Sequence, residues 1–479
     1  MKKILLSTAA LIAMGATASA ADLPARTTTK APVAAPLSNW TGFYVFGGGG
    51  YGLMTTDEAA NDGNHFASRQ GGRGWFGTVG GGYDYQFSPS WVAGVFGDAQ
   101  FGDIKGGVDF LNNNLIGSTK NKASYAVGAR LGYLIAPNVL SYVNGGYSHA
   151  DFSGSPLAEY YSAPIPAQIS KRSHDGWFLG GGVENSLDMF GLNAPGWFMK
   201  TEYRVAEYDR KSTTALTTSG ALFPYPLVTK PYVQTVSTSL VYRFNSHVTR
   251  DANANTPFIT KAVRLNATNW TGFYLAGGGG YGQWAADERP ILGNNVFKVA
   301  HSGGRGWFGT VGGGYDYQFR SSWVAGIFAD AQFGDIKGSF DARPGGYGGI
   351  TKNKTSYAAG ARLGYLIAPN VLSYVNGGYT RADFTGTTYY FNCCSLPKQH
   401  YDGWFVGGGV ENSLNMFGLN APGWFMKTEY RLAEYGRKTT AVNDPSAPNG
   451  ALSFKPYVQT VSTSLVYRFN WGSPIAARN

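Results

Sequence analysis

Hydrophobic and polar residues alternate with a period of two along most of this chain. The segment 231–244 shows the pattern clearly, because Leu240, Tyr242 and Phe244 alternate with Ser239 and Arg243. A period of two places one set on one face of a β-strand and the other set on the opposite face. An apolar face backed by a polar face fits a strand with lipid outside and a polar interior behind it.

The same alternation predicts eight strands in the first half of the chain. They lie near residues 40–53, 74–87, 90–103, 122–136, 138–152, 175–190, 196–209 and 231–244. The connections are alternately short and long, and the long ones are 54–73, 104–121, 153–174 and 210–230. A transmembrane up-and-down barrel has this rhythm, since its periplasmic turns are tight and its outer loops are long.

A long repeat divides the chain into two similar halves. The segment KPYVQTVSTSLVYRFN occurs at 230–245 and again at 455–470, and GGRGWFGTVGGGYDYQF occurs at 71–87 and at 303–319. We therefore predict an all-β fold of antiparallel, transmembrane, up-and-down type, with two tandem eight-stranded barrels at 39–245 and 269–470. The alternative is one sixteen-stranded barrel. The polar segment 246–268 is longer than a periplasmic turn needs, which favours two barrels.

The N-terminus predicts export. Lys2 and Lys3 precede an apolar run that ends at Met14, and Ala18-Ser19-Ala20 supplies a cleavage site, so residues 1–20 are expected to be a signal peptide. Residues 21–38 are then a periplasmic segment, 246–268 a periplasmic linker and 471–479 a C-terminal tail. These features predict a location in the outer membrane of a Gram-negative cell.

Composition supports a membrane-embedded β protein. Aromatic residues make up 15% of the chain and charged residues only 14%, whereas soluble domains average about 25% charged residues. The formal net charge is +10, but the basic residues are scattered, which gives no reason to expect nucleic-acid binding. The only cysteines, Cys393 and Cys394, are adjacent, so no disulfide framework is expected.

Charged residues fall on the inward positions of the predicted strands. Each half contains four acids and four bases that could pair inside a lumen: Asp84, Asp98, Arg130, Glu184, Lys200, Glu202, Arg204 and Arg243, then Asp316, Asp330, Arg362, Glu411, Lys427, Glu429, Arg431 and Arg468. An eight-stranded barrel is narrow enough for side chains to fill it, so this network predicts a structural plug. A proton or ion path lined by the same groups is the alternative.

Aromatic and basic residues gather near the strand ends. Two aromatic belts are predicted, one beside the short turns and one beside the long loops: Trp40, Phe87, Trp91, Phe190, Trp197 and Phe244, then Trp75, Trp177, Tyr208 and Tyr232. Basic residues lie in or beside the long loops: Arg69, Arg73, Lys105, Lys120, Lys122, Lys171, Arg172, Arg210, Lys211 and Lys230. They could bind the phosphates of lipopolysaccharide, or they could be ordinary solvated charges.

No catalytic, cofactor or metal site is predicted. The glycine-rich GGGGYG at 47–52 is not followed by a helical pattern, so it does not resemble a nucleotide-binding loop. Ser173, His174 and Asp175 are consecutive, and consecutive side chains of a strand point apart, which argues against a catalytic triad. The six histidines show no spacing typical of metal ligands.

Several segments carry a resemblance to a known family. NWTGFYVFGGGGYG, GWFGTVGGGYDYQF, YAVGARLGYLIAPNVLSYVNGGY, GWFLGGGVENSL and SLVYRF resemble, in this order, the alphaproteobacterial outer-membrane β-barrel family, also called porin-family or outer-membrane immunogenic proteins. The resemblance implies one eight-stranded barrel per copy, surface-exposed loops and a role in envelope integrity. It also implies that the final strands, with Tyr242, Phe244, Tyr467 and Phe469, carry the closing motif read by the barrel-assembly machinery.

Three functions are compatible with these features. The resemblance favours a structural envelope protein in contact with outer-membrane lipids and lipopolysaccharide. A porin-like channel for small solutes is the second possibility. A lipid-modifying enzyme is the third, although no nucleophile, base and orienting acid converge by spacing.

Overall fold

A computed structural model describes residues 39–244 and 269–469, apart from 61–64, 111–114, 137, 160–166, 191, 193, 218, 223–225, 297–298, 321, 342–347, 369, 389–394 and 446–448. The predicted signal peptide 1–20, the segment 21–38, the linker 246–268 and the tail 471–479 lie outside the described residues. Cys393 and Cys394 lie outside them as well.

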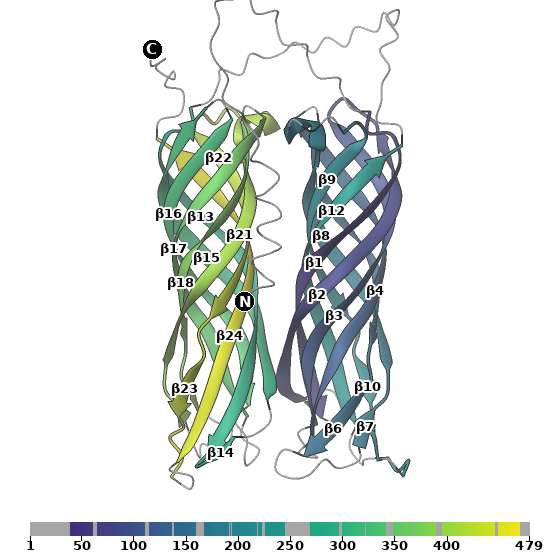
Figure 1. The fold of residues 1–479 in the computed structure, drawn as a ribbon, viewed down its shortest axis with the longest axis vertical. Coiled ribbons are helices and arrows are strands. Elements are labelled where there is room, and N and C mark those ends of the chain that lie inside the picture. The colour runs from purple at the N-terminus through teal and green to yellow at the C-terminus, as the bar shows by residue number, and fades with distance from the viewer. Residues whose placement is uncertain are drawn as a thin grey trace, which may run out of the picture. The chain divides into compact units, whose positions relative to one another are not determined.

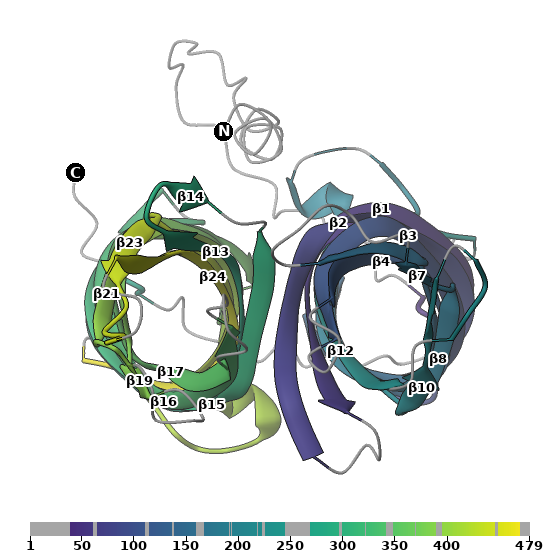
Figure 2. The ribbon, with the colours of Figure 1, turned by 90° about the horizontal axis from the view of Figure 1, so that it is seen from below.

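Two closed rings of antiparallel strands form the fold (Figures 1 and 2). The first ring consists of β1 Gly42–Ala60, β2 His65–Gln86, β3 Trp91–Phe110, β4 Leu115–Ala136, β5 Val139–Phe152, β8 Arg172–Ser186, β9 Trp197–Tyr208 and β12 Leu227–Arg243. The second consists of β13 Gly272–Leu292, β15 Ala300–Phe319, β16 Trp323–Asp341, β17 Gly348–Ala368, β18 Val371–Phe384, β21 Gln399–Ser413, β22 Trp424–Tyr435 and β24 Gly450–Arg468.

Each ring is closed by its own first and last strands. In the first, β1 pairs with β12, with Tyr44 opposite Arg243. In the second, β13 pairs with β24, with Tyr274 opposite Arg468. Each barrel therefore has eight long strands, which confirms the prediction of two barrels, and the alternative of a single sixteen-stranded barrel is wrong.

Short elements decorate the two rings. They are β6 Ser155–Glu159, β7 Ala167–Ile169, β10 Lys211–Thr213, β11 Ala215–Thr217, β14 Asn295–Val296, β19 Thr387–Thr388, β20 Ser395–Leu396, β23 Lys438–Ala441 and the 3-10 helices η2 Leu187–Phe190 and η3 Leu414–Phe417. The strand predicted for 175–190 thus ends at Ser186 and continues as η2. Among the described residues, no helix has the length and apolar character needed to cross a bilayer.

The strands are longer than the sequence pattern predicted. Strands β1 and β2 remain paired up to Ala60 and His65, so most of the predicted long connection 54–73 is strand. The same holds for 104–121, where β3 ends at Phe110 and β4 begins at Leu115. Polar residues occupy both faces of these extensions, which removes the alternation although the backbone ladder continues. We call this end of each barrel the loop end.

Side-chain facing follows the period of two within each barrel. On β4, the outward Val127 exposes 62% of its surface, whereas the inward Ala126 exposes 6%. The interiors are packed tightly enough that some inward positions require glycine: a Cβ atom on Gly94 would lie 2.0 Å from Oδ1 of Asp84. Each lumen is thus a filled core.

Two residues predicted for the aromatic belts lie inside the lumen instead. Trp40 is fully buried and packs edge-on against Phe198, with ring centroids 5.1 Å apart. Tyr208 shares the inward facing of Arg204 on β9 and is 2% exposed. Trp40 precedes β1, so the alternation of side chains along the strand does not determine which way its ring faces. Other predicted belt residues remain exposed at the two ends: Phe87, Trp91, Trp197 and Phe244 at the short-turn end, and Trp75 and Trp177 toward the loop end.

Candidate functional site

The charged lumen of each barrel is the candidate functional site. In the first barrel, Arg130 of β4 donates from Nε to Oδ1 of Asp84 at 2.9 Å and from Nη1 to Oε2 of Glu184 at 3.0 Å. Arg243 of β12 donates to the same acids, at 2.7 Å to Glu184 and 2.8 Å to Asp84. Each of these four side chains is at most 3% exposed. Two acids and two bases therefore form a closed, neutral set.

A second ionic set lies on the loop side of the first. Arg204 of β9 donates through both Nη atoms to Asp98, at 2.9 and 2.7 Å, and also to Glu202 at 2.8 Å. Nζ of Lys200 lies 3.7 Å from Glu202, and Tyr142 donates its hydroxyl hydrogen to the same carboxylate at 2.8 Å. This set also contains two acids and two bases, so it too is neutral.

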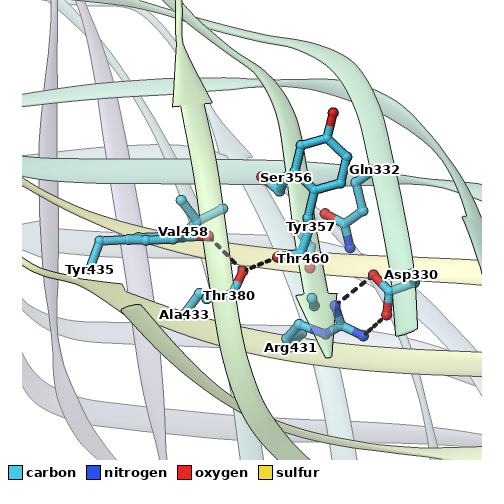
Figure 3. A pocket seen from close by; sticks show the side chains of 11 residues that line it. Asp330, Gln332, Ser356, Tyr357, Thr380, Arg431, Ala433, Tyr435, Val458 and Thr460 are labelled. Carbon is cyan, nitrogen blue, oxygen red and sulfur yellow. Dashed lines mark hydrogen bonds and ion pairs between the residues drawn. The ribbon is translucent and has the colours of Figure 1, made fainter. Parts of the chain in front are cut away.

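The second barrel repeats both sets. Arg431 donates to Asp330 at 3.0 and 2.8 Å, as Figure 3 shows. The remaining predicted lumen residues occupy the matching places: Asp316, Arg362, Glu411 and Arg468 in one set, and Glu429 and Lys427 beside Arg431 in the other. The structure therefore brings each predicted lumen residue into one of four ionic sets.

Little space remains around these charges. The lumen of each barrel holds a cavity of about 10 Å³, lined in the first by Asp98 and Arg204 and in the second by Asp330 and Arg431. This volume is close to the minimum for a single water molecule. Because a buried charge is costly unless it is paired, these groups are held in place by their partners. Such an arrangement fills and ties together the barrel wall.

The predicted basic rim is partly neutralised by acids that the sequence reasoning missed. Lys120 pairs with Asp103 at 2.7 Å, and Lys211 pairs with Asp175 at 3.3 Å. Most of the predicted rim residues belong to strands or their ends, and cross-strand register decides their partners. That register depends on strand extensions that the hydrophobic pattern did not reveal.

A row of bases nevertheless crosses neighbouring strands at the loop end. Arg73 of β2 stands opposite Lys105 of β3, which stands opposite Lys120 of β4. The second barrel has the same row in Arg305, Lys337 and Lys352. Lys105 and Lys337 are exposed.

The consecutive Ser173, His174 and Asp175 do not form a triad. His174 is buried, and its Nδ1 lies 2.9 Å from the carbonyl oxygen of Asp209. Asp175 points the other way, toward Tyr147 and His149. Within the described ranges, no group of three or more histidine, cysteine or acidic side chains is arranged to hold a metal ion.

The closing aromatic residues lie on the outer surface at the short-turn end. Phe244 and Phe469 expose 56% and 55% of their surfaces. Their rings meet those of Tyr242 and Tyr467 at centroid distances of 5.2 and 5.3 Å. Both copies therefore end in the same outward-facing aromatic pair.

Solved structures with detectable similarity are distant. The toluene transporter TbuX of Ralstonia pickettii is 9% identical, with 90% of each chain covered and a TM-score of 0.26. The toluene transporter TodX of Pseudomonas putida is 11% identical, with 91% of each chain covered and a TM-score of 0.26. Ail, the attachment invasion locus protein of Yersinia pestis, is 12% identical over 40% of this chain and 99% of its own, with a TM-score of 0.19. No curated protein matches the sequence.

A family match covers most of the chain. The sequence profile of the outer membrane protein β-barrel domain matches residues 7–244 and again residues 258–469. Each match contains one of the two closed rings with its charged lumen. The chain therefore belongs to the outer membrane protein β-barrel family and carries the family's domain twice.

Proposed function

We propose that this protein has a structural role in the integrity of the outer membrane, exposes its loop ends at the cell surface and catalyses no reaction. The observation that carries the proposal is the pair of neutral ionic sets in each lumen, exemplified by Arg130 with Asp84 and Arg204 with Asp98. Separating a buried charge from its partner is costly, so these ion pairs oppose any opening of the lumen. In this reading the chain is exported with a signal peptide at residues 1–20.

A porin-like channel for small solutes is the second candidate. The repeated polar cavity beside Asp98 and Arg204, and beside Asp330 and Arg431, is the feature that favours it. For solutes to pass, the ionic sets would have to separate and leave charges unpaired in a narrow lumen. Breaking a buried pair costs about 3–5 kcal/mol, so we rank the channel below the structural role.

Lipopolysaccharide is the proposed partner at the loop end. Lys105 and Lys337, the exposed middle bases of the two cross-strand rows, are accessible to phosphate groups at the loop end. Lysine and arginine are suitable partners for phosphate groups. Replacing Lys105 and Lys337 with glutamine should weaken binding to lipopolysaccharide micelles and reduce its salt dependence. Unchanged binding by this variant would contradict the proposed binding of lipopolysaccharide.

A deletion strain tests the structural role against the channel. Loss of a structural protein should make cells more sensitive to detergents and to large antibiotics, and the wild-type chain should restore resistance. Loss of a channel should instead slow the uptake of small solutes and leave detergent resistance unchanged. Slower uptake with normal resistance would therefore overturn the structural proposal.

A further inference from the structure

Outward positions near the loop end of each barrel carry polar residues that lipid would not favour. In the first barrel these are Thr55 and Asp57 of β1, Arg73 of β2, and Tyr232 and Gln234 of β12. The strands β12, β1 and β2 are neighbours in the ring, so these residues form one patch. The second barrel has a matching patch on β24, β13 and β15, formed by Ala285, Asp287, Arg305, Tyr457 and Gln459.

The two patches contact each other through reciprocal ion pairs. Arg73 donates through both Nη atoms to Asp287, at 2.9 and 2.8 Å. Arg305 donates in the same way to Asp57, at 3.0 and 2.5 Å. Asp57 and Asp287 occupy equivalent positions in the repeat, as do Arg73 and Arg305. The arginine of each barrel therefore binds the equivalent aspartate of the other barrel.

Tyrosine rings repeat this reciprocity. The guanidinium of Arg73 lies 3.6 Å from the ring centroid of Tyr457, and that of Arg305 lies 3.4 Å from the ring centroid of Tyr232. Tyr232 and Tyr457 are themselves equivalent, because each is the third residue of the repeated KPYVQT segment. A guanidinium over a tyrosine face adds cation–π attraction to the ion pair.

Two further contacts join equivalent residues directly. Gln70 of β2 forms an antiparallel bridge with Ser302 of β15, and the two occupy the same place in the repeat. Near the short turns, Ile135 and Val139 cluster with Ile367 and Val371, again as equivalent pairs. All four apolar side chains are at most 6% exposed.

Burial shows that these surfaces are covered. Leu53 and Gln234 face outward on β1 and β12, yet they are 0% and 1% exposed. Gln283 and Gln459 face outward on β13 and β24, and both are 0% exposed. Outward residues elsewhere on the same strands are open, such as Val45 at 48% and Leu275 at 58%.

An interface in which residue i contacts j and j contacts i is isologous, the kind that a twofold axis generates. From the reciprocal ion pairs, the contacts between equivalent residues and the burial, we infer that the outer surface of β12, β1 and β2 is a self-complementary pairing surface. Its partner is the equivalent surface of β24, β13 and β15 in the same chain. The tandem duplication thus joins a twofold pair of barrels covalently. This inference is independent of the structural or channel role proposed above.

Disulfide trapping in the full chain tests the pairing. The variant carries Gln70→Cys, Ser302→Cys, Cys393→Ser and Cys394→Ser, and a protease site is placed between residues 246 and 268. After outer-membrane extraction, oxidation and cleavage, we expect the two halves to migrate together on a non-reducing gel and to separate after reduction. Separate halves without reduction, or only disulfide-linked pairs of whole chains, would overturn the inference.

A matched control uses positions that the inference places away from the surface. Val143 and Val375 are equivalent, outward and exposed by 61% and 48%. The Val143→Cys/Val375→Cys variant in the same background should yield separate halves. Trapping equal to that of the 70/302 variant would show that oxidation joins any exposed pair, and the inference would fail.

Charge exchange gives a second, independent readout. In the cleaved protein, Arg73→Asp should raise the dissociation constant between the halves by about tenfold or more, because it places an acid beside Asp287. Adding Asp287→Arg should recover part of the affinity. Lys120→Asp, in the exposed pair with Asp103, should leave the affinity unchanged. No weakening in Arg73→Asp, or no recovery in the double variant, would contradict the pairing.

Discussion

Arg130 and Asp84 come from strands β4 and β2 and meet inside the first barrel, where Nε of the arginine lies 2.9 Å from Oδ1 of the aspartate. The equivalent residues of the second barrel, Arg362 and Asp316, make the same contact at the same distance. Both carboxylates are fully buried. The relationship fixes the wall of each barrel across its lumen.

Arg130→Ala should destabilise the first barrel strongly. It removes a partner from both Asp84 and Glu184 while leaving them buried, and loss of one partner of a buried pair costs about 3–5 kcal/mol. The change is measured by urea unfolding, with heat-dependent gel mobility reporting the folded fraction at each urea concentration. Lys120→Ala removes an exposed ion pair and should cost at most about 1 kcal/mol. Equal effects of the two substitutions would show that the buried set is not important for stability.

Gly94→Ala should displace Asp84 from its ionic set. The added Cβ would lie 2.0 Å from Oδ1 of Asp84, which is closer than any real contact. Gly97→Ala, on the same strand, adds a Cβ whose nearest neighbour is 3.6 Å away and should be tolerated. The measurement is again the urea midpoint of the barrel. A normal midpoint for Gly94→Ala would mean that Asp84 is free to move.

The sequence pattern was sufficient where one face of a strand is apolar and the other polar. Leu240, Tyr242 and Phe244 alternate with Ser239 and Arg243, so both the strand and its inward charge could be predicted. The pattern failed beyond the aromatic residues at the loop end, because Thr55 and Asp57 face outward while Thr56 and Glu58 face inward. With polar residues on both faces, a paired strand cannot be distinguished from a loop.

The direction in which a side chain near a strand end points, and the contacts between distant residues, were harder to predict than the strands themselves. Trp40 was expected in an aromatic belt because it is near a strand end, but it turns inward against Phe198. The partner of Arg73 could not be predicted at all, since Asp287 is 214 positions away and belongs to the other barrel. Such a contact depends on the arrangement of whole barrels and leaves no local pattern.

Phe469→Ala should reduce the amount of assembled protein. The closing strand of an outer-membrane barrel presents its aromatic end to the assembly machinery, a role that the family resemblance implies for Phe469. The measured quantity is the fraction of the protein that shows heat-dependent mobility in membranes. Phe244→Ala changes the equivalent residue of the first barrel and tests whether the assembly machinery also recognises the closing strand of that barrel. Full assembly of Phe469→Ala would exclude the role.

Acid should weaken the pairing of the two barrels. Both aspartates accept hydrogen bonds as carboxylates, Asp57 from Arg305 and Asp287 from Arg73. Protonation removes the negative charge and with it the ion pair, and an aspartate is protonated mainly below about pH 4.

The cleaved halves should therefore remain associated from neutral pH down to about pH 5 and separate only below about pH 4. Size-exclusion chromatography across this range measures the association. Heat-dependent mobility at each pH shows that the barrels themselves remain folded. Separation already at about pH 6, or full association at about pH 2, would contradict the role of the two aspartates.

Single-channel recording in a planar bilayer tests the central claim, that each lumen is closed by its own paired charges. The purified wild-type protein should show no steady, resolved conductance. The Arg130→Ala/Arg204→Ala variant opens both ionic sets of the first barrel and provides the comparison under the same conditions. Steady, resolved conductance steps from the wild-type protein would contradict a closed lumen and would favour the channel.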